Sequence, residues 1–168
     1  MPLNTGFIGE LKHEANNTRK ILSRIPEASF AWRPHEKSMT LERLACHVAE
    51  LPQWVAHIIN SGEFDFAKQV FNRRTASSSA ALMDIFETCM NDAIALLETV
   101  SDEQLNEQWM MRRGEVIAYT LTKKIALRNL VMNHIIHHRG QLSVYLRLLN
   151  VPVPGLYGPS ADERPPTP

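Results

Sequence analysis

The spacing of the apolar residues is the strongest constraint on how this chain can fold. They recur every three or four positions over four long stretches, which places them along one face of an α-helix in each case. The four stretches are residues 3–25, 41–59, 79–100 and 122–149. Since no repeated strand pattern accompanies them, the sequence predicts an all-α chain folded as an antiparallel four-helix bundle with long connections.

Prolines, a capping motif and a turn refine the ends of the predicted helices. Pro26 follows the first stretch, and Pro52 lies inside the second, where it predicts a kink or a helix that restarts. Ser101-Asp102-Glu103-Gln104 has the form of a capping box and predicts a short extra helix. Residues 112–115 resemble a turn, and residues 116–121 are expected to form a brief extended piece before the last helix.

The chain length sets the domain organisation. With 168 residues, of which 44% are hydrophobic, the sequence can bury one full core but not comfortably two. We therefore predict one four-helix domain over residues 1–150. Residues 151–168 are rich in proline, lack an apolar period and are predicted to form a C-terminal tail.

Composition argues against several classes of protein. Eighteen basic residues balance eighteen acidic ones, and no patch of Lys and Arg interleaved with aromatics is present, so nucleic acid is not the expected partner. No stretch approaches the roughly 20 apolar residues of a membrane helix, and no signal segment is recognised, which predicts a soluble, cytoplasmic protein without membrane contacts. The two cysteines, Cys46 and Cys89, are expected to be reduced packing residues.

Two histidines interrupt the apolar stripe of the last helix. His134 and His138 are four residues apart, so both imidazoles leave the same helix face and can converge on one ion. They occupy positions of the expected buried stripe where leucine would be usual. That stripe is Leu127, Leu130, Val131, His134, His138, Leu142, Tyr145 and Leu149.

A third ligand is available on the second helix. His47 lies between Leu44 and Leu51 in the stripe of that helix. Three neutral imidazoles from two facing helices would bind a divalent ion and leave one coordination position open for water or substrate, as catalytic zinc sites do. Imidazole accepts several metals, so Zn²⁺ and Ni²⁺ both fit and the choice between them stays open.

The alternatives to this site are specific. His137 forms a second possible pair with His134, and histidines in a stripe can instead be hydrogen-bonded core residues. Metal-bound imidazoles usually donate their second nitrogen to an acceptor, and the candidate partners are His137, Asn133, Gln141 and Glu50. For Glu50 an exposed position on the helix is the preferred interpretation. Gly140, inside a helix, predicts close approach of another helix from a second subunit.

Several short motifs resemble one known family. Trp32-Arg33-Pro34, the segment 38–50 that ends in His47-Val48-Ala49-Glu50, the segment 134–142 that begins His134-Ile135-Ile136-His137-His138, and the tail 151–163 occur in an order that is similar to the DinB/YfiT-like family of metalloenzymes. The resemblance spans most of the chain. The damage-inducible expression to which the family name refers is not evidence of DNA binding.

The resemblance implies a four-helix bundle, often a homodimer, that holds a divalent metal. The family ligand positions map to His47, His134 and His138. Family members of known activity include transferases and isomerases that use low-molecular-weight thiols such as bacillithiol or mycothiol. The expected function is therefore a metal-dependent transferase, isomerase or hydrolase acting on a small-molecule substrate, with a thiol or water as nucleophile. The alternatives are a dimeric module that binds a metal or small ligand without catalysis, and a metal-free interaction domain.

Overall fold

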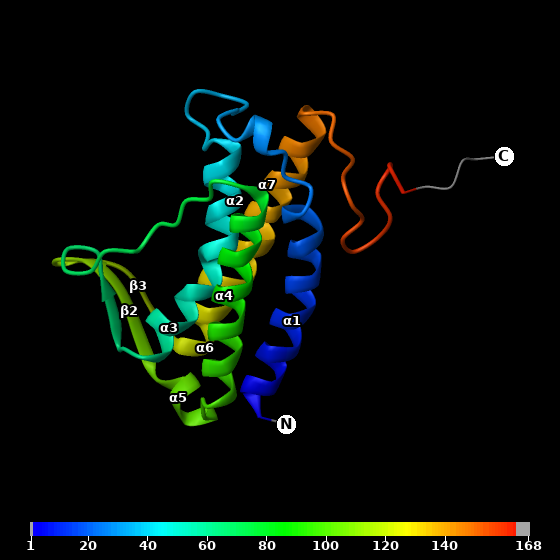
Figure 1. Ribbon diagram of the computed structural model, residues 1–168. Helices are drawn as coiled ribbons and strands as arrows, with labels where there is room; N and C mark the ends of the chain where they lie inside the picture. Colours follow the sequence, from blue (N-terminus) through cyan, green and yellow to red (C-terminus); the bar gives the residue numbers. More distant parts are fainter. Residues whose placement is uncertain (1, 164–168) are drawn as a thin grey trace.

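The computed structural model describes residues 2–163 of the chain, which are mostly helical (Figure 1). Four helices lie side by side: α1 packs on α4 and α7, and α2 packs on the same two helices. They are α1 (Leu3–Leu22), α2 (Leu41–Glu50), α4 (Ser79–Glu98) and α7 (His134–Leu148). All four regions of helical periodicity are thus helical, as the sequence predicts.

The directions of these helices differ from a fully antiparallel arrangement. Asn4 donates to the carbonyl of Leu97, and Tyr145 donates to that of Met39, so α1 is antiparallel to α4 and α7 is antiparallel to α2. In contrast, α2 and α4 both run from top to bottom in Figure 1. The reason is the long connection over residues 60–78, which carries the chain back to the end where α2 begins.

The second helical region restarts at proline, as predicted. After α2 the chain makes a turn of 3₁₀-helix, η2 (Leu51–Gln53), and then α3 (Trp54–Ile59). Pro52 has no N–H to donate to the preceding turn, which explains the interruption. The predicted capping box is also present: the Ser101 hydroxyl and Gln104 side chain satisfy each other's backbone N–H groups and open α5 (Asp102–Asn106). A further short turn, η1 (Glu27–Ser29), follows α1.

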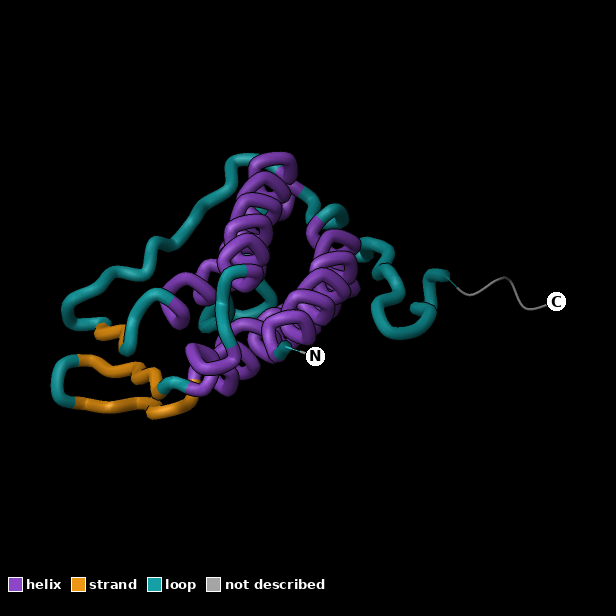
Figure 2. Tube along the Cα trace, turned by 90° about the horizontal axis from the view of Figure 1, so that it is seen from below, coloured by secondary structure: helices purple, strands orange, loops and turns teal. Residues whose placement is uncertain are grey.

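The chain is mostly helical, but the all-α prediction is wrong because a small sheet is present. Its strands are β1 (Glu63–Asp65), β2 (Gln108–Arg113) and β3 (Val116–Thr122), in the order β1-β2-β3. β1 is parallel to β2, and β2 is antiparallel to β3 through a turn in which Gly114 has φ +56°. Figure 2 shows the sheet beside the helices rather than among them.

The last helical region has three parts. It begins with α6 (Lys123–Leu127), passes through a π-helical segment, η3 (Arg128–Asn133), and continues as α7. A π-helical turn contains an extra residue relative to the α-helix and is frequent next to functional sites. His134 is the first residue of α7 and therefore directly follows this irregular turn.

The described part of the tail is fastened to α1 and α7. Lys20 donates to the carbonyl of Gly155 at 3.2 Å, and Arg24 donates to that of Pro152 at 3.2 Å. Arg147 forms an ion pair with Asp162 at 2.7 Å. The rest of the predicted tail, residues 164–168, lies outside the described residues, and the division at residue 150 stays a prediction.

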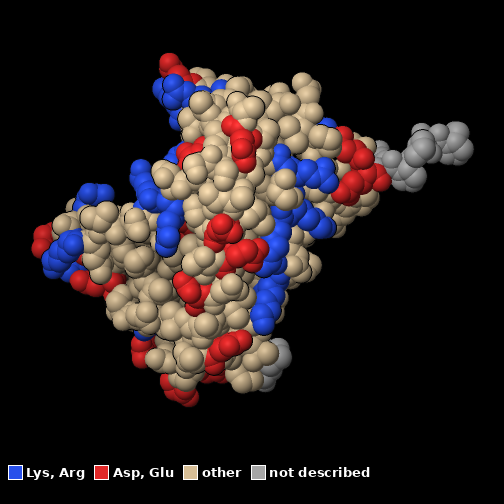
Figure 3. Space-filling model, viewed as in Figure 1, with Lys and Arg blue, Asp and Glu red and all other residues tan. Residues whose placement is uncertain are grey.

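The helices and the surface charge bear on two expectations from composition. Over residues 2–163, no helix is both long enough and apolar enough to cross a membrane. On the face drawn in Figure 3, basic and acidic side chains are interspersed. The expected lack of a nucleic-acid partner and the cytoplasmic location stay predictions.

Candidate metal centre

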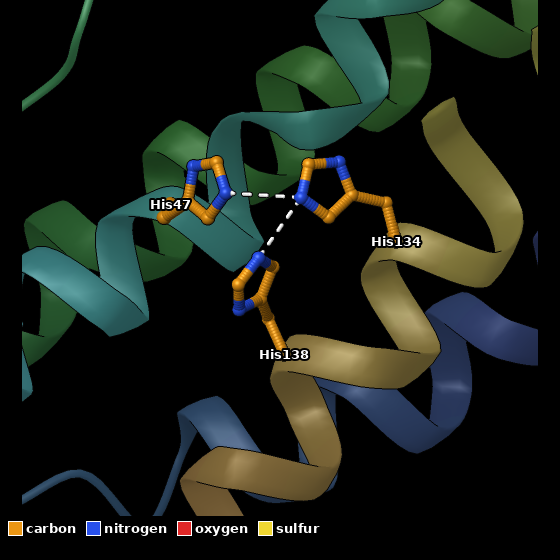
Figure 4. A group of neighbouring side chains, drawn as sticks. All are labelled: His47, His134 and His138. Carbon is orange, nitrogen blue, oxygen red and sulfur yellow. Dashed lines mark hydrogen bonds between the residues drawn. The ribbon is translucent and has the colours of Figure 1, made fainter. Parts of the chain in front are cut away.

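Three histidines from two helices meet between α2 and α7 (Figure 4). The Nε2 atom of His134 lies 3.4 Å from Nε2 of His47 and 2.9 Å from Nε2 of His138. Nitrogens bound to one tetrahedral zinc ion at about 2.05 Å are roughly 3.4 Å apart. The spacing of these nitrogens therefore suits ligands of a single ion, and the three residues are those selected from the sequence.

The second nitrogen of each ring has its own partner. Nδ1 of His138 is 2.7 Å from Oε1 of Gln141, and Nδ1 of His47 is 3.5 Å from Oε1 of Glu50. For His134 the backbone of Leu130, inside η3, acts as the acceptor, and it raises the pKa of the ring against the larger lowering by burial. Since amide, carboxylate and carbonyl oxygens only accept, each Nδ1 carries the proton of the neutral ring.

The positions of the ring protons leave the three Nε2 atoms facing one another without a proton. With Nδ1 protonated in each neutral ring, all three Nε2 atoms present lone pairs toward one point. They cannot hydrogen-bond one another, because no proton lies between them. A cation at that point would resolve the repulsion, and oriented imidazoles with acceptors on the far nitrogen are usual in metal sites. The donor set therefore fits a divalent ion.

The charge state of the rings favours the same interpretation. Burial, assisted by the neighbouring histidines, lowers the pKa of His134 to about 4. Burial likewise lowers the pKa of His138. At neutral pH both rings are therefore in the neutral form that binds metals.

The burial of Glu50 differs from the sequence-based prediction. It was expected to be an exposed helix residue, but it is fully buried at the end of α2. Its carboxylate accepts hydrogen bonds from Arg43 and, at 2.7 Å, from the backbone N–H of Arg74. Because it also faces Nδ1 of His47, it is placed to orient that ring. The spacing of Arg43 and Glu50, two turns apart on one helix, was the available signal for this pair.

The remaining outer candidates lie on the surface of α7 and η3. Gln141 links two histidines: its oxygen faces His138, and its nitrogen is 3.2 Å from Nε2 of His137. His137 itself does not reach the cluster of three Nε2 atoms. Asn133 lines a cavity of about 390 Å³ together with His134 and His137. The geometry thus favours His138 over His137 as the partner of His134.

The link between Gln141 and His138 can be tested directly. The Gln141→Leu variant removes the acceptor of the His138 Nδ1 proton, and loss of such an outer partner typically weakens metal binding by about 10–100-fold. Competition with a zinc chelator would measure this loss. The exposed Leu148→Gln change at the far end of α7 serves as the control. Unchanged affinity in Gln141→Leu would show that this hydrogen bond does not orient the ring.

The buried stripe of α7 is rotated from the predicted one. Ile135, Arg139, Leu142 and Leu146 face the core, whereas His134 and His138 are half-buried at its edge. The side chain that the sequence interpretation missed is Arg139, which is only 1% exposed. Its partners are Glu14 and Thr18 on α1 and Tyr157 in the tail. The π-helical segment η3, which contains an extra residue relative to an α-helix, directly precedes α7 and accounts for a shift of about one residue in the buried face.

Two further cavities border the cluster. One of about 300 Å³ is lined by His47 and His134, and another of about 390 Å³ by His138 and Gln141. The first is enclosed mainly by aromatic and basic residues. Its lining consists of Met39, Arg43, His47, Glu50, Trp54, Phe66, Phe71, Arg73 and His134. The walls Trp54, Phe66 and Phe71 were not assigned to the site from sequence.

The cysteines are expected to be unreactive in the folded chain. Cys46 is fully buried, and burial together with its hydrogen bond to Glu42 raises its pKa to about 12. Burial also raises the pKa of Cys89. At pH 8 a thiol of pKa 12 is ionised to about one part in ten thousand, and the thiolate is the reactive form. Iodoacetamide should label neither cysteine in the native protein and both after unfolding. Rapid labelling of Cys46 would show that α2 opens.

A mainly helical fold in which two helices direct three imidazoles at one point defines a class of helical proteins with a candidate divalent-metal centre. The chain belongs to the DinB family, whose sequence model matches residues 1–166. This match confirms the family that the sequence motifs indicated.

Relatives and solved structures agree with this assignment. The uncharacterized protein YrdA of Bacillus subtilis is 25% identical over 157 residues, covering 94% of this chain and 89% of YrdA. The uncharacterized protein YjoA of the same organism is 27% identical over 132 residues, covering 79% of this chain and 81% of YjoA.

Two crystal structures share the fold. The DinB-like protein YjoA superposes with a TM-score of 0.65 at 24% identity, covering 86% of this chain and 94% of its own. A DinB-like protein from Bacillus cereus superposes with a TM-score of 0.68 at 22% identity, covering 91% and 97%. At these identities the likeness concerns the fold alone.

Proposed function

We propose that this protein is a divalent-metal-dependent enzyme that uses His47, His134 and His138 as ligands and transfers a thiol to a small electrophile. The observation that supports it best is the convergence of three Nε2 lone pairs beside two cavities. A bound Zn²⁺ or Ni²⁺ would lower the pKa of a thiol or water in its open position and so supply a nucleophile at neutral pH. Helices α1, α2, α4 and α7 would form the four-helix bundle that carries the site.

The protein's own groups have defined roles in this proposal. Glu50, Gln141 and the Leu130 carbonyl hold the three rings with Nε2 inward. The aromatic wall of Trp54, Phe66 and Phe71 gives the cavity an apolar side against which a substrate can lie. In the reaction the thiol loses its proton to solvent, the sulfur forms a bond to the electrophilic carbon, and the leaving group departs with the electron pair of the bond that breaks between it and that carbon.

The alternative is a non-catalytic module that only holds a metal or small ligand. It predicts that protein groups fill all coordination positions of the metal. Cavities on both sides of the histidines argue for the enzyme, because substrate and nucleophile each have a path to the ion. Transfer with water as nucleophile would make the protein a hydrolase, and the same geometry supports it.

A screen of thiols tests the proposal. Protein loaded with Zn²⁺ or Ni²⁺ is mixed with cysteine, bacillithiol or mycothiol and with the electrophile monobromobimane, and formation of the fluorescent conjugate is followed. Acceleration by the loaded protein, lost in His134→Ala and retained in His137→Ala, would support the transferase. Stoichiometric metal binding without acceleration of any thiol or of hydrolysis would favour the binding module.

The homodimer is also a proposal. A Cβ atom added at Gly140 would meet nothing within 4 Å among residues 2–163, so none of the described helices explains the glycine. A second copy that packs on α7 at this position would explain it. Sedimentation of Gly140→Leu, expected to shift the chain toward monomer, checks the interface.

A further inference from the structure

Beyond the histidines, the lining of the cavity of about 300 Å³ includes an arginine, Arg73, whose charge has no partner among the described residues. Arg73 lines this cavity, is exposed, and makes no side-chain hydrogen bond or ion pair with any residue between 2 and 163. Arg43 lines it too, but its guanidinium is already engaged by Glu50 and by the carbonyl of Arg74. Arg73 is therefore the charge left available to a ligand.

A second, outer cavity continues the first. It has a volume of about 490 Å³ and shares Phe66, Phe71 and Arg73 with the inner one. Arg113 also lines it, with its guanidinium carbon 5.6 Å from the centre of the Phe66 ring. None of the described residues that line the outer cavity is acidic. Two arginines thus line a pair of adjoining cavities, the inner of which is also lined by His47 and His134.

The wall between these arginines and the histidines is aromatic. Trp54 and Phe71 stack with ring centroids 4.9 Å apart and planes inclined by 16°, and Phe66 lies beside Trp54 at 6.3 Å. Such a surface suits a flat apolar group, whereas a guanidinium fork matches a carboxylate. Trp54 lines only the inner cavity with the histidines, and Arg113 lines only the outer one, which favours an apolar group toward the histidines and an anionic group farther out.

We propose that Arg73, with Arg113 beside it, binds the carboxylate of a substrate whose apolar, aromatic body lies against Trp54, Phe66 and Phe71 and directs its reacting end toward the histidines. This inference rests on the proposed function for the identity of the site. It adds a substrate class: aromatic carboxylates with the electrophilic carbon at the end opposite the carboxylate.

Binding of a matched pair of probes tests the proposal. 2-Naphthoate and 2-naphthamide have the same apolar body, but only the first carries a negative charge. In chelator-treated protein, where the probe cannot bind a metal, we expect naphthoate to bind about tenfold more tightly by calorimetry, the size of one charge-assisted hydrogen-bonded pair. The Arg73→Gln variant should remove that difference and leave naphthamide unchanged. Arg33→Gln, an exposed arginine that lines none of these cavities, is the matched control.

The outcomes separate this inference from the proposed function. The carboxylate site would be contradicted if both probes bound equally or if neither bound. It would also be contradicted if Arg73→Gln abolished the binding of both probes. Each of these results is independent of metal binding. Conversely, a preference for naphthoate that depends on Arg73 would stand even if the protein failed to bind metal. A smaller loss in Arg113→Gln than in Arg73→Gln is expected, because Arg113 lines only the outer cavity.

Discussion

The His134→Ala variant is expected to lose the bound divalent ion almost completely, from about one ion per chain to less than about a tenth, because two imidazoles rarely retain an ion that three hold. His134 contributes the central nitrogen of the cluster: its Nε2 faces both of the others, at 3.4 and 2.9 Å. His47→Ala and His138→Ala are expected to lose the ion as well. Elemental analysis of protein purified without a His-tag or a chelating column measures the effect.

The same helix supplies the control for this prediction. His137 lies beside His138, but its Nε2 contacts Gln141 and not the other ligands. His137→Ala should therefore retain the ion. Equal loss from His134→Ala and His137→Ala would contradict the choice of ligands. No ion in the natural chain after reconstitution with zinc and nickel would favour histidines that serve only in packing.

Much of the helical framework could be predicted because its signals are local. Periodicity gave the four helical regions, Pro52 gave the restart, and Ser101 gave the cap of α5. The sheet was less accessible. β1 has three residues, and it pairs in parallel with β2, some 45 positions later in the chain, so no local pattern announces it. The direction of α4 depended on the path of residues 60–78, which has no periodic signal.

The candidate site also combines residues that local patterns predict with residues that they do not. The spacing of His134 and His138 is a local pattern, and His47 could be added because it occupies an apolar position of another helix. What could not be foreseen is the burial of Glu50, which depends on Arg43 and on the backbone of Arg74 in a distant loop. The aromatic wall likewise combines α3 with residues that flank β1. These contacts exist only after the sheet and the long connection are folded.

Arg139 shows how a residue inside a recognised motif can have a structural role that the motif does not reveal. It is 1% exposed, and its guanidinium donates at 3.0 Å to the Glu14 carbonyl, at 3.1 Å to Thr18 and at 2.5 Å to the Glu14 carboxylate. The hydroxyl of Tyr157 also donates to that carboxylate, at 2.7 Å. The network therefore joins α1, α7 and the tail one residue beyond His138.

Removing the buried acid from this network is expected to destabilise the protein strongly. Glu14→Ala would leave the Arg139 guanidinium buried without its counter-charge, and breaking a buried pair in this way typically costs about 3–5 kcal/mol. The matched control is Glu10→Ala, one turn earlier on α1, which breaks the ion pair with Arg128. That pair is 42% and 36% exposed, so its loss should cost less than about 1 kcal/mol. Urea denaturation of the two variants measures both free energies of unfolding. Similar small losses would mean that water reaches Arg139 and that Tyr157 of the tail does not shield it.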